Sequence, residues 1–78
     1  MQIEIISPER VLFRGNVDVV SVPGALGAFT ILKSHAPIVS VLQSGVLAYG
    51  TEDSKQELRI EGGFLEASGD KITICVEQ

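Results

Sequence analysis

The stretch KITICVE, Lys71–Glu77, alternates between apolar residues and other residues along its whole length. Ile72, Ile74 and Val76 occupy one phase of this alternation, and Cys75 lies on the opposite phase. Successive side chains of a β-strand point to opposite faces of the sheet, so the pattern indicates a strand with one buried face. β-branched residues dominate the stretch, and they pack better on a pleated surface than in a helix.

The same period of two recurs elsewhere in the chain. It is seen at Ile3 and Ile5, at Val17 and Val19, and at Leu58 and Ile60. Pairs containing glycine or proline, such as those at 23–24, 44–45 and 62–63, interrupt the apolar runs at short intervals and favour turns. No segment keeps the i, i+3, i+4, i+7 spacing of an amphipathic helix. The residues alone therefore predict eight to ten short strands in one all-β domain, a sandwich or a barrel.

Composition excludes several classes of function. The 78 residues carry a net charge of −4, and the six basic residues are dispersed, so the basic footprint of a nucleic-acid-binding protein is missing. Cys75 is the only cysteine, which excludes an internal disulfide and favours a reducing compartment. No apolar run approaches the ~20 residues of a membrane-spanning helix, and the first ten residues do not form a signal peptide. We expect no direct insertion into lipid.

A phosphate-binding loop is the first candidate for chemistry. Gly24-Ala25-Leu26-Gly27 superficially resembles a glycine-rich cradle. Such loops carry a third glycine or a Gly-Lys-Ser/Thr ending, and they open a helix whose N-terminus binds the anion. Here the following residues, Phe29 to Ile31, have the character of a strand. The segment is therefore interpreted as a turn between strands.

Catalysis and metal binding are the next candidates. His35 and Cys75, with Ser34 or Ser40, are the residues from which a catalytic dyad would be built. One histidine and one cysteine about 40 residues apart are weak evidence, and a cysteine within a strand is more often a packing residue. The same two residues cannot supply the four ligands of a structural metal site. We expect no active site, no metal and no cofactor.

Two further interpretations remain open from the residues alone. Gly69-Asp70-Lys71 has a passing similarity to the hairpin of a small all-β carrier domain that bears a lipoyl or biotinyl group on its lysine. Leu26 and Phe29 lie in or beside a turn rich in glycine and proline, where apolar residues either plug the core or face a partner. Composition alone favours the plug.

Seven short motifs then resemble those of one family. They are Ser7-Pro8-Glu9, Leu12-Phe13-x-Gly15, Val22-Pro23-Gly24-x-x-Gly27-x-Phe29, His35-Ala36-Pro37, Gly45-Val46-Leu47, Gly62-Gly63-Phe64-x-Glu66 and Lys71-x-Thr73. In this order and spacing they are similar to the N-terminal domain of the epsilon subunit of F-type ATP synthases. The resemblance runs over nearly the whole chain, and it implies a single domain over residues 1–78. It also implies a flattened antiparallel β-sandwich of about ten short strands, with essentially no helix.

The resemblance also implies a role. In that family the domain is a non-catalytic part of the central stalk, packs on the gamma subunit, and contacts the polar loops of the c-ring. It turns with the rotor and couples ion flow to ATP synthesis. The expected location is peripheral, on the cytoplasmic face of the energy-transducing inner membrane.

Individual residues can be carried over from the family's pattern. Ser7, His35 and Ser40 match positions that contact the gamma subunit, and Ala25, Leu26, Gly27, Ala28 and Phe29 match the turn that meets the c-ring. Many relatives have an acidic residue where Ala28 stands and a glycine where Thr30 stands. Without that acid, an apolar contact through Leu26 or Phe29 is expected in place of a salt link, with Ile31 turned inward.

The chain also differs from the family in length. Most relatives continue into a C-terminal helical hairpin that inhibits ATP hydrolysis or, in some, binds ATP. This sequence ends at Gln78, just after the last predicted strand. The expectation is therefore a chain without an inhibitory arm and without a nucleotide site.

Overall fold

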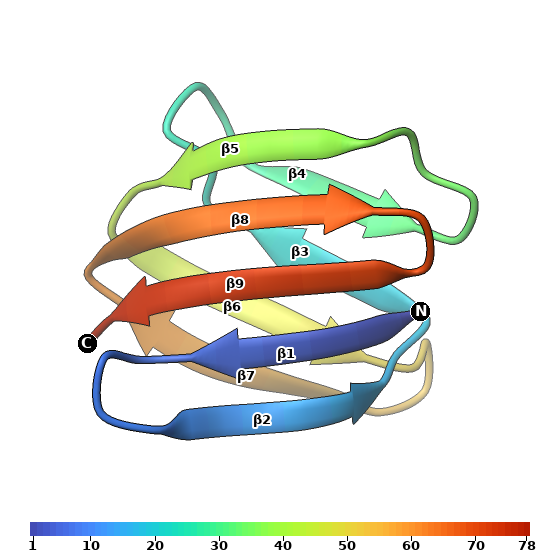
Figure 1. Cartoon of the computed structure of the whole chain (residues 1–78), viewed down its shortest axis with the longest axis horizontal. Coiled ribbons are helices and arrows are strands. Elements are labelled where there is room, and N and C mark those ends of the chain that lie inside the picture. The colour runs from blue at the N-terminus through green and yellow to red at the C-terminus, as the bar shows by residue number, and fades with distance from the viewer.

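All 78 residues are described by the computed structural model, in which two β-sheets pack face to face (Figure 1). The strands are β1 (Gln2–Ile6), β2 (Val11–Asn16), β3 (Val19–Val22), β4 (Phe29–Leu32), β5 (Ile38–Leu42), β6 (Gly45–Gly50), β7 (Lys55–Ile60), β8 (Gly62–Ser68) and β9 (Lys71–Glu77). None of the elements is a helix that could cross a membrane. The predicted all-β sandwich is confirmed, with nine strands where about ten were expected.

Five strands form sheet A, in the order β2-β1-β9-β8-β5, and four form sheet B, in the order β4-β3-β6-β7. Every neighbouring pair is antiparallel except β1 and β9, which run parallel. Short hairpins force antiparallel pairing, but the first and last strands have no short connection that would fix their relative direction. The first and last strands lie side by side inside sheet A, and the two termini lie at opposite ends of these strands (Figure 1).

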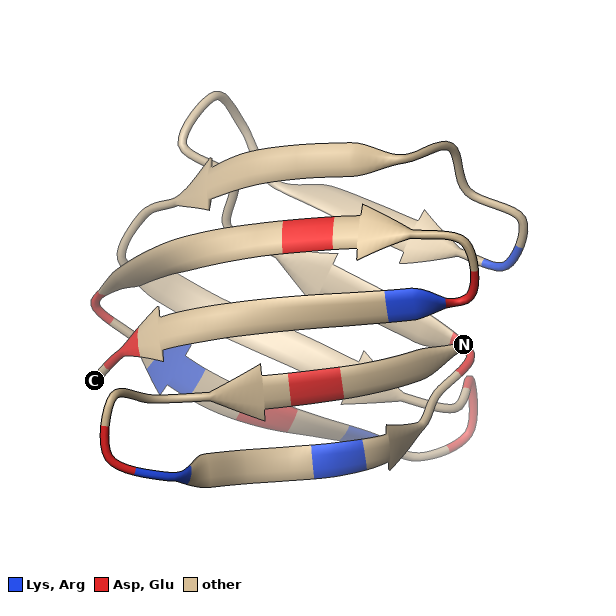
Figure 2. Ribbon diagram, in the orientation of Figure 1, with Lys and Arg blue, Asp and Glu red and all other residues tan.

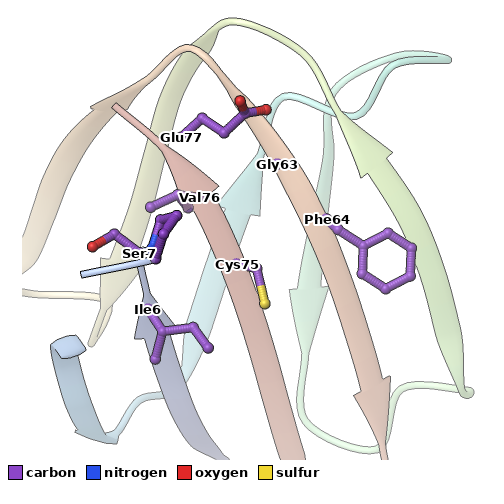
Figure 3. Close-up of a pocket in the computed structure, with 8 residues that line it drawn as sticks. Ile6, Ser7, Gly63, Phe64, Cys75, Val76 and Glu77 are labelled. Atoms are coloured by element: carbon purple, nitrogen blue, oxygen red, sulfur yellow. The ribbon is translucent and has the colours of Figure 1, made fainter. Parts of the chain in front are cut away.

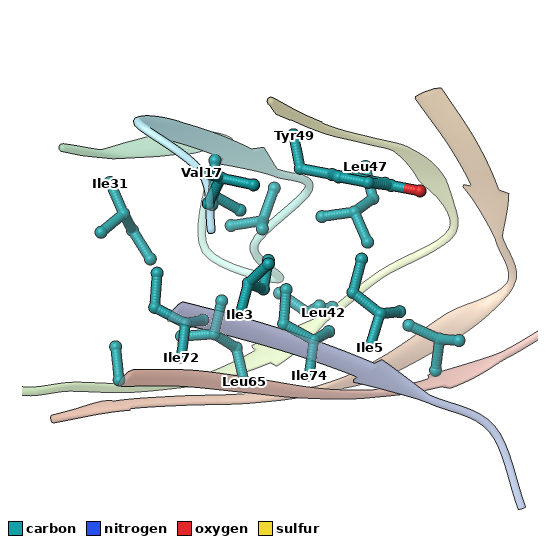
Figure 4. Close-up of a cluster of buried hydrophobic side chains, with 14 of the residues drawn as sticks. Ile3, Ile5, Val17, Ile31, Leu42, Leu47, Tyr49, Leu65, Ile72 and Ile74 are labelled. Carbon is teal, nitrogen blue, oxygen red and sulfur yellow. The ribbon is translucent and has the colours of Figure 1, made fainter. Parts of the chain in front are cut away.

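The core fills the space between the sheets (Figure 4). In KITICVE, Ile72, Ile74 and Val76 are all buried and Cys75 is exposed, as the alternation predicts. Ile74 lies opposite Leu65 on β8 and beside Ile5 on β1, so one inward row of large aliphatic side chains crosses the sheet. No polar or charged side chain belongs to the buried set, and a purely apolar core avoids the cost of unpaired polar groups.

A β-bulge changes the pairing of β1 with β2. Ile5 faces Phe13, whereas the next residue, Ile6, faces Val11, so Leu12 has no direct partner. Both Leu12 and Phe13 pack against the core as a result. Val11 is left on the outer face of sheet A beside Ile6, which is the kind of local redirection that a bulge produces.

Candidate functional site

An unbroken row of apolar side chains crosses the outer face of sheet A. Val41 on β5 faces Phe64 on β8, and Phe64 faces Cys75 on β9. Cys75 in turn faces Ile6 on β1, and Ile6 faces Val11 on β2. We call these five residues the apolar row, since a free cysteine packs as a small hydrophobe. At about 4.8 Å between strands the row is roughly 19 Å long.

The apolar row lies outside the core. Val41 is 60% exposed, Val11 is 46% exposed and Phe64 is 44% exposed. The inward phase of each strand is already filled by core residues, so these side chains have no surface of this chain to cover them. A contiguous exposed apolar patch is typical of a site where another protein binds.

A groove accompanies the apolar row at the end of the sheet where β1 and β9 finish. It holds about 460 Å³, and its apolar lining residues are Ile6, Pro8, Phe64, Cys75 and Val76. Ser7, Gly63 and Glu77 complete the lining. Figure 3 shows Cys75 between Ile6 on β1 and Phe64 on β8, with Glu77 at the far end of the groove.

The adjacent row on the same face has a different character. It runs from Val39 through Glu66, Thr73 and Glu4 to Arg14. Nε of Arg14 donates a hydrogen bond to Oε2 of Glu4 at 2.8 Å, so these two charges satisfy one another. Figure 2 shows the same charged positions near the middle of the strands. The outer face of sheet A therefore has an apolar end and a charged strip beside it.

The outer face of sheet B has smaller and more polar side chains. Thr30, Ser21 and Ala48 form a row across β4, β3 and β6. The hydroxyl oxygens of Ser21 and Thr30 lie 3.0 Å apart, within hydrogen-bonding distance. The exposed apolar residues of this sheet, Leu32 and Val46, lie on opposite sides of that row. Sheet A therefore offers the more continuous apolar surface.

The turn Ala25–Phe29 joins β3 to β4 and is tied to sheet A. The amide of Ala25 donates to the carbonyl of Val41 at 2.8 Å, and the amide of Gly27 donates to the carbonyl of Gly24 at 3.0 Å. A Cβ atom at Gly24 would lie 2.6 Å from the Gly27 carbonyl oxygen, so only glycine fits there. The turn leads into a strand, as the sequence predicted, and not into the helix of a phosphate-binding loop.

The two large residues of this turn point in different directions. Leu26 is fully exposed at the tip of the turn. Phe29 is partly buried, packs against the core, and places its ring over Gly24. Ile31 is buried, as expected. Leu26 is thus the apolar side chain that this turn presents to its surroundings, and Ala28 beside it is also exposed.

The residues matched to gamma-subunit contacts do not form one cluster. Ser7 lies in the turn after β1, where its hydroxyl accepts from the amide of Arg10 at 3.3 Å. Ser40 lies on β5, on the inward phase opposite the buried Leu65, and is half-buried at the edge of the sheet. His35 lies in the loop before β5. All three border sheet A, but only Ser7 lines the groove.

His35 has an unusual set of contacts. Its Nδ1 lies 2.9 Å from the carbonyl oxygen of Ala36, and because a carbonyl only accepts, Nδ1 carries the proton. Its Nε2 is buried and has no hydrogen-bond partner. Cys75 lies on the outer face of β9, and no hydrogen bond connects it to His35. The two residues therefore do not form a catalytic dyad in this structure.

The family assignment follows from the whole length of the chain. Residues 1–78 match the family described as the β-sandwich domain of the ATP synthase delta/epsilon chain. The chain belongs to this family. The resemblance found in the seven motifs is thereby confirmed.

Relatives of the delta/epsilon family show the extent of the match. The ATP synthase epsilon chain of Leptospira borgpetersenii is 38% identical over 77 residues, which are 99% of this chain and 61% of the relative. The epsilon chain of Maricaulis maris is 40% identical over 78 residues, which are 100% of this chain and 59% of the relative. This delta/epsilon domain therefore spans about three-fifths of the length of these relatives.

Solved structures show the same delta/epsilon sandwich at much lower sequence identity. A chain of the Euglena gracilis mitochondrial ATP synthase aligns with a TM-score of 0.89 at 19% identity, over 97% of this chain and 49% of its own length. A chain from the central stalk and c-ring of the Tetrahymena thermophila enzyme aligns with a TM-score of 0.81 at 15% identity, over 100% of this chain and 63% of its own length. At these identities the likeness establishes the fold.

Proposed function

We propose that this chain is a non-catalytic subunit of the central stalk of an F-type ATP synthase. It turns with the rotor and transmits the motion that couples ion translocation to ATP synthesis. Membership of the delta/epsilon family supports this assignment. The chain works at the cytoplasmic face of the energy-transducing membrane as a peripheral protein, and it needs neither a cofactor nor a nucleotide for this role.

The apolar row is the observation on which the proposal rests. The gamma subunit is the partner that covers it, and the outer face of sheet A is the surface that packs on gamma. Burial of apolar area stabilises a contact that must persist during rotation, whereas exposed ion pairs contribute only ~0–1 kcal/mol each. Ser7 and His35 lie at the margins of this surface, and Ser40 lies at its edge on β5.

The turn Ala25–Phe29 is the proposed contact with the c-ring. Leu26 is fully exposed and supplies an apolar contact, because Ala28 leaves the turn without an acid for a salt link. The Ala25–Val41 hydrogen bond joins this turn to β5, one end of the apolar row. A second backbone hydrogen bond, from the amide of Gln43 to the carbonyl of Pro23 at 2.8 Å, lies beside it, so the two proposed contacts are joined by a short antiparallel bridge and not by a flexible linker.

Cys75 provides a direct test of the proposed interface. It is the only cysteine of the chain and lies at the centre of the apolar row. We expect the rate of its alkylation by a maleimide to fall about tenfold when purified gamma subunit is present at ten times its Kd, since only the free chain reacts. The rate is measured by mass spectrometry over time.

A relocated cysteine serves as the control. In the Cys75→Ala background, Glu57→Cys places a thiol on β7 of sheet B, where the native residue is exposed. Gamma should leave its alkylation rate unchanged. If gamma co-elutes with the chain but Cys75 stays fully reactive, the outer face of sheet A is not the interface.

Leu26→Ser is expected to weaken the contact with the c-ring and to leave the contact with gamma unchanged. Burying a leucine contributes about 1.5–3 kcal/mol, so the chain–gamma complex should bind purified c-ring roughly 10- to 100-fold more weakly. Leu32→Ser is the matched control, because Leu32 is an exposed leucine at the other end of β4. Equal behaviour of the two variants in a c-ring binding assay would argue against the turn.

No observation favours the alternative of a carrier domain modified at Lys71. Lys71 is the first residue of β9, and the tip of the preceding turn is formed by Gly69 and Asp70. A carried group would appear as added mass on the native protein.

A further inference from the structure

The groove beside the apolar row carries a negative charge at one end. Its lining is apolar at Ile6, Pro8, Phe64, Cys75 and Val76, and no lysine, arginine or histidine lines it. Glu77 is its only carboxylate. An apolar groove with a single acid at one end matches a side chain with an apolar stem and a cationic head.

The Glu77 carboxylate is not used within the chain. The ion pairs of the molecule join Arg14 to Glu4 and the N-terminus to Asp70, and neither involves Glu77. No side-chain hydrogen bond to Glu77 is formed either; the hydrogen bond between Glu61 and Glu77 runs from backbone amide to backbone carbonyl. Its Oε1 lies 3.4 Å from the place that a Cβ of Gly62 would occupy, so the carboxylate sits close over the glycine backbone.

We propose that this groove binds one basic side chain, an arginine or a lysine, of the gamma subunit. The aliphatic stem lies against Ile6, Cys75 and Phe64, and the charged head pairs with the carboxylate of Glu77. This inference rests on the proposed function, because it needs gamma to cover the outer face of sheet A. To the proposed interface it adds the type of gamma side chain that is bound and the groove that binds it.

Charge complementarity distinguishes this occupant from a purely apolar one. An apolar side chain would leave Glu77 desolvated and unpaired at the end of the groove, which is unfavourable. A basic side chain gains a charge-assisted hydrogen bond there, and its stem still covers the apolar floor.

Glu77→Gln tests the proposal, and Glu66→Gln is its matched control. Both glutamates are exposed on sheet A, but Glu66 belongs to the row of Val39 and Thr73 and does not line the groove. We expect Glu77→Gln to raise the Kd for purified gamma about tenfold at low ionic strength, and Glu66→Gln to change it less than about twofold. Increasing salt should weaken the binding of Glu77→Gln less than that of the unchanged chain.

The possible outcomes distinguish a failure of this inference from a failure of the proposed function. If the two variants have the same Kd for gamma, or if Glu77→Gln binds with the full salt dependence, the groove does not bind a basic side chain. The proposed function is not contradicted by that result. If the unchanged chain fails to bind gamma, the proposed function and this inference both fall. Thermal unfolding of both variants should match that of the unchanged chain, because neither glutamate has an ion-pair partner.

Discussion

Phe64→Asp is expected to lower the affinity of this chain for the gamma subunit by on the order of 100-fold or more, while the sandwich stays folded. Phe64 lies in the apolar row between Val41 and Cys75, and its ring is the largest side chain there. The substitution removes the apolar area of an aromatic ring and buries an unpaired carboxylate in its place. Isothermal titration calorimetry with purified gamma measures the effect.

The neighbouring row supplies the control for this substitution. Thr73→Asp puts the same charge on the same outer face, next to Glu4 and Glu66 and outside the apolar row. A much smaller loss of affinity is expected from it. Phe64→Leu keeps most of the apolar area and should bind almost as well as the unchanged chain. Binding of Phe64→Asp at full affinity would contradict the proposed interface.

Leu65→Ala, one residue further along β8, is expected to lower the stability of the fold. Leu65 is fully buried and packs between the sheets opposite Ile74. Removing the side chain should lower the free energy of unfolding by about 3 kcal/mol, through lost transfer energy and the cavity left behind. A chain of 78 residues has a total stability of only about 4–12 kcal/mol, so the loss is a large share of it.

Urea unfolding followed by circular dichroism measures this loss. Val41→Ala is the control, because Val41 is 60% exposed and its truncation should change the free energy of unfolding by less than about 0.5 kcal/mol. We therefore expect adjacent residues to have different effects: Phe64→Asp should weaken binding to gamma, and Leu65→Ala should weaken folding. A Leu65→Ala chain as stable as the unchanged one would show that the core collapses around the cavity at no cost.

Alternation was sufficient to predict which side chains of the last strand enter the core. In KITICVE it identified Ile72, Ile74 and Val76 as the inward phase, and the structure buries all three. Ile31, which the resemblance placed inward, is buried as well. Alternation succeeds because the period of two depends only on local backbone geometry, which the sequence expresses directly.

The apolar row could not be predicted in the same way. Its members come from five strands, and they align only through the register between strands, including the parallel pairing of β1 with β9 and the bulge at Leu12. Register is set by contacts between distant segments, so no local pattern reports it. The one local signal was Cys75 on the phase opposite Ile74. For Phe29 the difficulty was similar, because its inward turn depends on the close approach of Gly24.

The parallel pairing of β1 with β9 has a consequence for synthesis of the protein. Ile6 is synthesised well before its neighbour Cys75, and the apolar row stays divided until β9 lies between β1 and β8. A nascent chain therefore lacks the surface proposed for gamma until nearly all of the domain has emerged. We therefore expect binding to gamma to wait until the sandwich has closed.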